Sequence, residues 1–190
     1  NTFNHNYTSL WFEQGNYDVI NGFNNIYGNN FDNSGGKIIK TPHVQEDPFH
    51  HIYLNLVTGI TIGNSLQDEN IFHNSINGIY SKKSNLKVFN NSFNNIGSDG
   101  YQNRVIVYPI ASANAAINTT GDNSSLYSLI AGGPNANELN RFNECEMGVL
   151  VYLDMNINVT YNVFNLCKLA CQLQSIKNGN IIFKNNINQK

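Results

Sequence analysis

Large apolar residues recur along the chain with asparagines at fixed positions around them. Two positions before each of these anchors the residue is Asn in seven of eight cases, with His51 as the exception, and the position after it is Asn in six of eight. Five of the seven spacings between successive anchors lie between 19 and 23 residues, which predicts a repeat of 20 to 25 residues. The anchors are Phe3, Phe23, Tyr53, Phe72, Phe93, Phe142, Phe164 and Ile187.

Short alternations of apolar residues lie at constant distances from these anchors. Seven and nine residues after an anchor, paired positions are mostly apolar and the residue between them faces the other way, as expected of a short half-buried strand. These pairs are Leu10/Phe12, Ile60/Ile62, Ile79/Ser81, Val149/Val151 and Cys171/Leu173. A third strand is predicted before the anchor at 86–88 and 157–159. Three short strands per repeat predict a parallel β-helix, because one coil can bury its apolar face only against the next coil.

Asparagine makes up 37 of the 190 residues. Disorder is an alternative explanation of such a composition, but 12% of the residues are aromatic and the asparagines keep a fixed phase against them. Asn tolerates the left-handed backbone region, and its amide can bond to the Asn of the coils above and below. We therefore expect asparagine ladders at the bends of the coils.

Three units carry a resemblance to a known family: residues 70–74, read Asn-Ile-Phe-His-Asn, residues 91–95, read Asn-Ser-Phe-Asn-Asn, and residues 140–143, read Asn-Arg-Phe-Asn. They resemble repeats of the pectate-lyase-like superfamily, which implies an all-β, right-handed parallel β-helix, here of about seven to nine coils. The resemblance covers the chain except about residues 33–50 and 101–139. Because the superfamily includes lyases, hydrolases, epimerases, tailspikes and adhesins, it implies no single activity. A left-handed β-helix would need a hexapeptide period, and a leucine-rich repeat would need Leu at the anchors and a helical stretch; neither is found.

Two segments, at about 33–51 and 97–139, interrupt the repeat. Insertions in solenoids often build the binding face, although they can also cover an exposed edge. The whole chain, 1–190, is predicted to be a single β-helix domain that contains these two insertions. The repeat is in phase at both Asn1 and Ile187 without a capping helix, so we expect a segment of a longer protein whose other domains dock on both ends.

The sequence contains no complete catalytic constellation. Its 13 carboxylates are scattered, and adjacent pairs such as Asp68-Glu69 point to opposite faces of a strand. The Asp-Asp pair and the Gly-His-Gly motif of pectin hydrolases, which the resemblance would imply for that activity, are both missing. No acidic ladder suited to Ca²⁺ is present either.

Aromatic residues are the candidates for ligand contact. Trp11 and Tyr80 occupy equivalent outward positions, and Phe31 is a further outward candidate; sugar faces could stack on these rings. In the second insertion, Arg104 lies between Tyr101 and Tyr108 and could form part of a sugar site. The alternative is that a neighbouring domain or loop covers these rings.

Histidine and cysteine offer weaker candidates. His43, His50 and His51, with His73, form the one cluster with metal-binding potential, but we favour the interpretation that they fill bend positions, and we predict no metal or other cofactor. Cys145 and Cys167 share a column in adjacent coils, and Cys171 follows. In-register side chains have poor disulfide geometry, so we predict a buried cysteine ladder instead.

We therefore expect a non-catalytic, secreted or cell-surface β-helix module that serves in adhesion, in glycan contact or as a structural rod. The Asn-rich, Lys-poor composition resembles secreted surface proteins of Bacteroidota-type bacteria. Polysaccharide is the predicted partner beside the neighbouring domains. A net charge of −2 argues against nucleic acid, and the lack of an apolar run of about 18 residues argues against membrane insertion. The alternatives are part of a polysaccharide lyase or glycoside hydrolase completed outside this segment, and a tailspike-like trimer.

Overall fold

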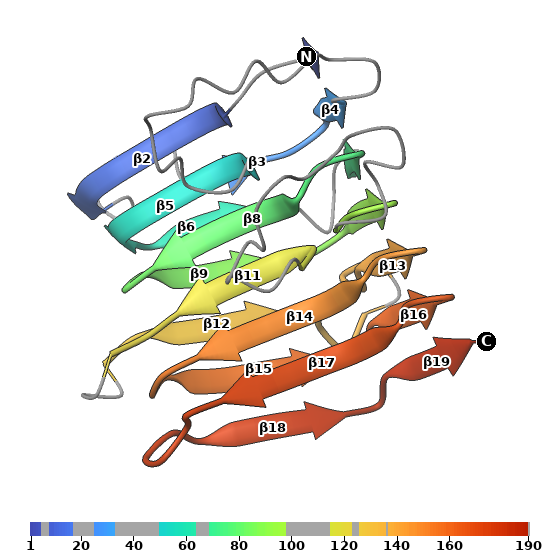
Figure 1. The fold of residues 1–190 in the computed structure, drawn as a ribbon. Helices are drawn as coiled ribbons and strands as arrows, with labels where there is room; N and C mark the ends of the chain where they lie inside the picture. Colours follow the sequence, from blue (N-terminus) through green and yellow to red (C-terminus); the bar gives the residue numbers. More distant parts are fainter. Residues whose placement is uncertain are drawn as a thin grey trace, which may run out of the picture.

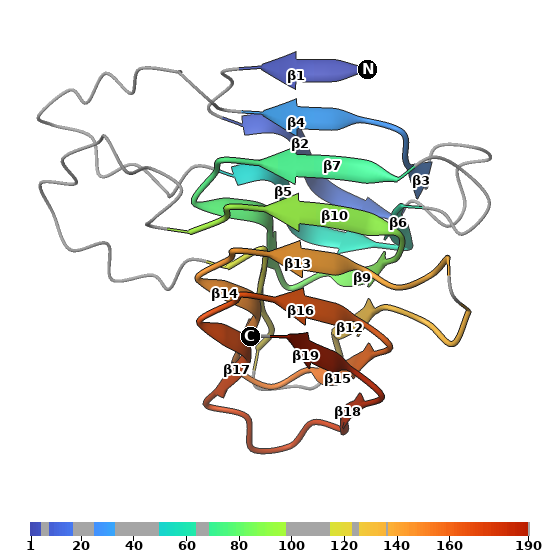
Figure 2. The same cartoon turned by 90° about the vertical axis from the view of Figure 1, so that its right-hand side faces the viewer.

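The computed structural model describes residues 1–4, 8–16, 25–32, 50–63, 69–97, 115–122, 126–135 and 137–189. These residues form three parallel sheets that wind as a right-handed parallel β-helix, as predicted (Figure 1). Each coil contributes one strand to each sheet in a fixed order, and the N-terminus and C-terminus lie at opposite ends of the solenoid (Figure 2).

Sheet A carries the Asn-x-Phe-Asn units. Its strands are β1 (Thr2–Asn4), β4 (Asn30–Asp32), β7 (Asn70–His73), β10 (Asn91–Asn94), β13 (Arg141–Asn143), β16 (Val163–Asn165) and β19 (Ile187–Gln189). The seven strands are stacked in chain order, one for each successive coil (Figure 2).

Sheets B and C complete each coil. Sheet B consists of β2 (Thr8–Asn16), β5 (His50–Thr58), β8 (Asn77–Lys82), β11 (Ile117–Thr120), β14 (Met147–Tyr152) and β17 (Leu169–Gln174). Sheet C consists of β3 (Asn25–Ile26), β6 (Ile60–Ile62), β9 (Asn85–Val88), β12 (Ser128–Ala131), β15 (Asn156–Thr160) and β18 (Ile181–Lys184).

A continuous stack of phenylalanine rings lies inside sheet A. Successive ring centroids are 4.9, 4.7, 4.7, 5.1 and 4.7 Å apart, and the interplanar angles are at most 10°. The stack consists of Phe3, Phe31, Phe72, Phe93, Phe142 and Phe164. All but the terminal Phe3 are buried, so this column is the centre of the core.

The stack corrects two of the predicted anchors and one predicted outward aromatic residue. Phe31 is not an outward aromatic residue but the second ring of the stack, fully buried. Tyr53 lies on β5 in sheet B, and the partner of Phe164 in β19 is Asn188 rather than Ile187. Phe23 lies outside the described residues. A count along the sequence failed here because the coils are joined by connections of very different length.

An asparagine ladder runs beside the rings, as predicted, and it has a direction. In each coil the side-chain amide of one Asn donates to Oδ1 of the Asn in the next coil, over 2.9 to 3.1 Å. The ladder consists of Asn1, Asn29, Asn70, Asn91, Asn140, Asn162 and Asn186. Asn29 and Asn186 take the places predicted for Asn21 and Asn185. His51, predicted in the same column, belongs to β5.

Part of the predicted insertions belongs to regular coils. His50 and His51 begin β5, and β11 and β12 lie within 97–139. Because β10 pairs directly with β13, residues 91–140 form one coil with long connections. Ile60 and Ile62 belong to sheet C, where they pair with Leu86 and Val88, and not to the sheet B column in which the repeat placed them.

Candidate functional site

A row of three aromatic rings occupies the outer face of sheet B. Trp11 on β2 pairs with Tyr53 on β5, which pairs with Tyr80 on β8. The equivalence of Trp11 and Tyr80 was predicted, and the register confirms it. Tyr53 was missed because the repeat assigned it to a buried anchor.

The three rings pack against one another along the solenoid. The Trp11 and Tyr53 rings are stacked with centroids 4.1 Å apart, and the Tyr53 and Tyr80 rings are 5.9 Å apart and tilted by 32°. Tyr53 is only 5% exposed, whereas Trp11 is 56% exposed. One face of the Trp11 ring therefore packs on Tyr53, which fixes the orientation of the indole, and the side chain remains accessible to solvent.

A row of polar side chains lies beside the aromatic row. Glu13, Asn55 and Lys82 each follow one of the three aromatic residues by two positions, so they share its face of the strand, and they are paired in the same register. The Asn55 amide donates to Glu13 Oε1 over 3.4 Å. The Lys82 ammonium group lies 5.8 Å from the centroid of Tyr53 and 5.3 Å from that of Tyr80, within the range of a cation–π contact. Because residues two positions apart in a strand share a face, Glu13 and Lys82 could have been identified by counting two positions on from Trp11 and Tyr80.

This arrangement places an exposed apolar surface next to hydrogen-bonding groups. Ligand sites combine aromatic contact area with a few polar groups that fix orientation. The row supplies an anionic carboxylate, an amide and an ammonium group within three coils. It can therefore bind a ligand that has both apolar faces and hydroxyl groups.

The adjacent histidines do not converge on a metal site. The His50 ring lies 5.1 Å from the Tyr53 ring and 5.3 Å from the Tyr80 ring, whereas the His51 ring lies 5.7 Å from Phe31 and 6.0 Å from Phe72. The two rings thus face opposite sides of the coil. Within the described part of the chain, no three His, Cys, Asp or Glu side chains come together as metal ligands.

His51 is a structural residue of the core. Its Nε2 is 2.8 Å from the carbonyl oxygen of His73, and the side chain is fully buried. Burial lowers the pKa of His51 to about 4. The imidazole is therefore neutral in the folded protein at neutral pH.

We expect His51 to make the protein less stable in mild acid. Because the folded-state pKa lies below the unfolded value of about 6.5, the unfolded chain binds a proton first, and stability is lost as the pH falls from about 6.5 to about 4. The loss from this residue is roughly 3 kcal/mol. Denaturant titrations at several pH values should show this slope, and His51→Asn should flatten it. His73→Asn, the same substitution at the half-buried partner, should retain the slope; a slope that is the same in all three proteins would contradict the assignment.

The cysteines lie in the core near the C-terminal end. None of the three is in a disulfide, and Sγ of Cys145 and Sγ of Cys167 approach backbone carbonyl oxygens at 3.4 to 3.7 Å. Burial raises the pKa of the Cys145 thiol, and burial also raises that of Cys171 to about 11. A hydrogen bond with Cys145 lowers the pKa of Cys167. Cys145 is buried, whereas Cys167 and Cys171 are only half-buried, so the predicted burial of the cysteines is confirmed for Cys145 alone.

The Asp154 side chain is buried, and its carboxylate is hydrogen-bonded to backbone N–H groups. It accepts hydrogen bonds from the backbone N–H groups of Lys177 and Asn178 in the connection before β18. Both bonds lower the pKa of Asp154, and the bond from Lys177 has the larger effect. The carboxylate thus links the connection between β14 and β15 in one coil to the connection between β17 and β18 in the next coil.

The remaining predicted candidates, His43, Tyr101, Arg104 and Tyr108, lie outside the described residues. Among the residues that are described, there is no helix with the length and apolar character needed to cross a membrane. No protein-family model, curated protein or solved structure matches this chain.

Proposed function

We propose that this chain is a non-catalytic module of a secreted or cell-surface protein that contacts glycan through the outer face of sheet B at Trp11. The observation that carries the proposal is the 56% exposure of a tryptophan held rigidly by stacking on Tyr53. A tryptophan offers a large apolar contact area together with a polar N–H, and ligand sites combine such an area with a few polar groups that fix orientation. Glu13 and Asn55 border it here.

The chemistry of a sugar ring suits this surface. One face of a pyranose presents C–H groups with slight positive charge, and the indole face carries negative charge from its π system. Hydroxyl groups at the rim of the sugar can then bond to Glu13 and to Asn55. Because Tyr53 fixes the indole before binding, little side-chain entropy is lost when the sugar binds.

We also propose, from the units around Phe72, Phe93 and Phe142, that the chain is a distant member of the pectate-lyase-like superfamily from Bacteroidota-type bacteria. In this proposal the regular Phe stack and Asn ladder form the rod that presents the aromatic row.

Intrinsic fluorescence provides the test, because Trp11 is the only tryptophan. Binding of a soluble neutral glucan or of polygalacturonate should change the Trp11 emission, and a glycan array identifies further ligands. Trp11→Ala should weaken binding about tenfold or more, which corresponds to a loss of about 1.4 kcal/mol. Since that variant has no tryptophan, its binding is measured by calorimetry.

Leu126→Ala is the matched control. Leu126 is 73% exposed and lies before β12, away from the aromatic row, so its removal should leave glycan binding unchanged. Binding that is equal in both variants, or the absence of any glycan ligand, would contradict the contact site. Release of sugar products from the polysaccharide would contradict the non-catalytic assignment.

A further inference from the structure

Part of the outer face of sheet B is buried although no described strand covers it. Leu150 is 4% exposed, yet its neighbours Val149 and Val151 belong to the core, so Leu150 faces the other side of β14. Every described strand belongs to one of the three sheets, and none is left to lie over this face. An outward side chain of this size can be buried only by another segment that packs on the sheet.

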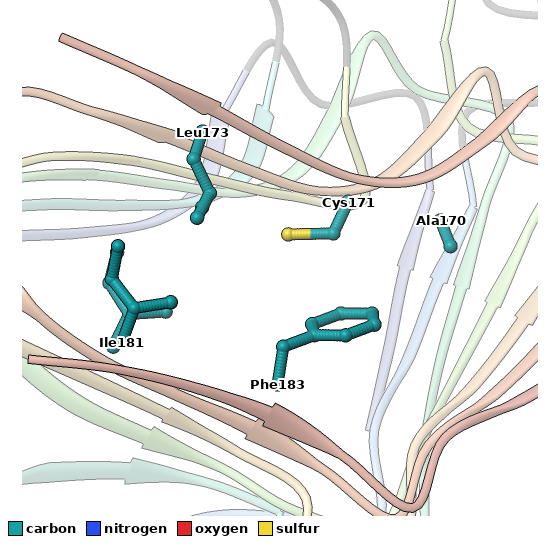
Figure 3. A pocket seen from close by; sticks show the side chains of 6 residues that line it. Ala170, Cys171, Leu173, Ile181 and Phe183 are labelled. Carbon is teal, nitrogen blue, oxygen red and sulfur yellow. The ribbon is translucent and has the colours of Figure 1, made fainter. Parts of the chain in front are cut away.

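Tyr152 marks the limit of the covered area. It follows Leu150 by two positions and shares its face of β14, but it is 42% exposed. Leu150 is also more deeply buried than two inward residues of the last described coil. Leu173 and Phe183, which line an open hollow between β17 and β18, are 37% and 45% exposed (Figure 3). The cover therefore lies on one part of the outer face and ends between Leu150 and Tyr152.

Leu150 belongs to a second apolar cluster, separate from the main core. The other members are Ala115, directly before β11, and Met147 on β14. Asn118, which pairs with Leu150, is 4% exposed and donates from its amide to Asn77 Oδ1 over 3.1 Å. The covered area thus extends over β8, β11 and β14, next to the corner at which the chain passes from sheet A to sheet B.

Two of the connections that lead from sheet A to sheet B are long: 33–49 before β5 and 98–114 before β11. In the order of sheet B, β8 and β11 separate β5 from β14, which carries Leu150. The second connection leads directly into Ala115, a member of the cluster, and it contains the apolar residues 105–107, read Val-Ile-Val. The cluster is buried in the single chain, so no second copy is needed to cover it.

We propose that the connection 98–114 docks on the outer face of sheet B and supplies the apolar side chains that bury Met147 and Leu150. Removal of both apolar surfaces from water favours the docked arrangement. Because Asn118 and Leu150 continue the column of the aromatic row beyond Tyr80, a glycan bound to that row cannot extend past Tyr80. This limit rests on the proposed function, whereas the docking itself does not.

Limited digestion of the complete 190-residue chain with trypsin tests the docking without any glycan, because each long connection carries its own cleavage sites. Arg104 lies in 98–114, whereas Lys37 and Lys40 lie in 33–49. A docked segment must detach before a protease can bind it, so cleavage reports the open fraction. In the wild type, cleavage after Arg104 should be at least about tenfold slower than in a synthetic peptide of residues 98–114. Mass spectrometry of the fragments identifies each cleaved site.

Leu150→Asn removes the apolar contact and should accelerate cleavage after Arg104 about tenfold or more. Tyr152→Asn is the matched control, because it places the same residue on the same face of β14 at an exposed position. Its rate at Arg104 should equal that of the wild type. Cleavage at Lys37 and Lys40 should be the same in all three proteins.

A variant of the connection itself provides an independent test. Ile106→Asn combined with Val107→Asn leaves sheet B unchanged and should accelerate cleavage after Arg104 as Leu150→Asn does. Adjacent residues of a strand-like segment face opposite sides, so one of the two is expected to contact the cluster. A synthetic peptide with the same two changes corrects for their effect on trypsin. Circular dichroism verifies that each variant is folded, and this variant alone decides the outcome where Leu150→Asn does not fold.

Three results would overturn the inference. Cleavage after Arg104 that is as fast in the wild type as in the peptide would mean that the connection is not docked. An effect of Leu150→Asn at Lys37 and Lys40, instead of at Arg104, would assign the cover to 33–49. Equal rates at Arg104 in the wild type and in the folded variants would contradict the contact between 98–114 and the cluster.

Discussion

Phe93→Ala is expected to lower the free energy of unfolding by about 3–5 kcal/mol. The Phe93 ring is fully buried and lies between the rings of Phe72 and Phe142, with centroids 4.7 and 5.1 Å away. Its removal deletes two stacked pairs, each worth about 0.5–1.5 kcal/mol beyond the burial of the ring. The hole cannot collapse well, because the strands of adjacent coils are held about 4.8 Å apart by their backbone hydrogen bonds.

Equilibrium unfolding in urea measures this loss, with the slope against denaturant examined for a change in the extent of unfolding. Tyr152→Ala is the control, because Tyr152 is a large aromatic residue on sheet B that is 42% exposed. Its replacement should cost less than about 1 kcal/mol. Equal losses at the two positions would show that the Phe stack is not the main support of the core.

The sequence predicted this stack well where the repeat unit was complete. Phe72, Phe93, Phe142 and Phe164 each follow an Asn by two positions and follow one another at intervals close to one coil or to one coil with a long connection. The unit also predicted the ladder, because a buried Asn beside each ring has few partners other than the Asn of the next coil.

The first coils were misassigned for a physical reason. Phe23 has Asn both two positions before it and directly after it, whereas Phe31 is followed by Asp32. The local pattern therefore favours Phe23. The pairing of β4 with β1 and with β7 selects Phe31 instead. Strand pairing across 28 and 41 residues depends on how the connections fold, and local composition does not contain that information.

The candidate site was predictable in part. Outward alternation identified Trp11 and Tyr80, since strand residues alternate between the two faces. The outward position of Tyr53 between them was not recognised. Tyr53 follows His51 by two positions, so it could be aligned with the buried anchors. Its role as the support of Trp11 became visible only from the register of β2 with β5.

Asn140→Asp is expected to destabilise the protein by about 3–5 kcal/mol at neutral pH, the size of effect that follows when a buried charge is left without a partner. The Asn140 amide donates to the carbonyl oxygen of Val88 over 2.8 Å and to Asn162 Oδ1 over 2.9 Å. A carboxylate of the same shape still accepts from Asn91 but places its second oxygen against two acceptors. Val88 O keeps the hydrogen bond from the Gly132 N–H, and Asn162 Oδ1 keeps the one from the Asn140 N–H, so the cost comes mainly from the carboxylate oxygen that faces these two acceptors.

The pH dependence separates this effect from a simple loss of packing. Burial and the two facing acceptors raise the pKa of the introduced carboxyl above its unfolded value of about 3.9, so its neutral form, which can donate one hydrogen, is favoured in the fold. The deficit should therefore be smallest in acid and should grow as the pH rises through the folded-state pKa. Subtracting the wild-type free energy at each pH removes the opposite slope of His51. Asn180→Asp, at an exposed position, should stay within about 0.5 kcal/mol of the wild type. A deficit at Asn140 that does not change with pH would mean that the ladder acts through the shape of its side chains rather than through the direction of its hydrogen bonds.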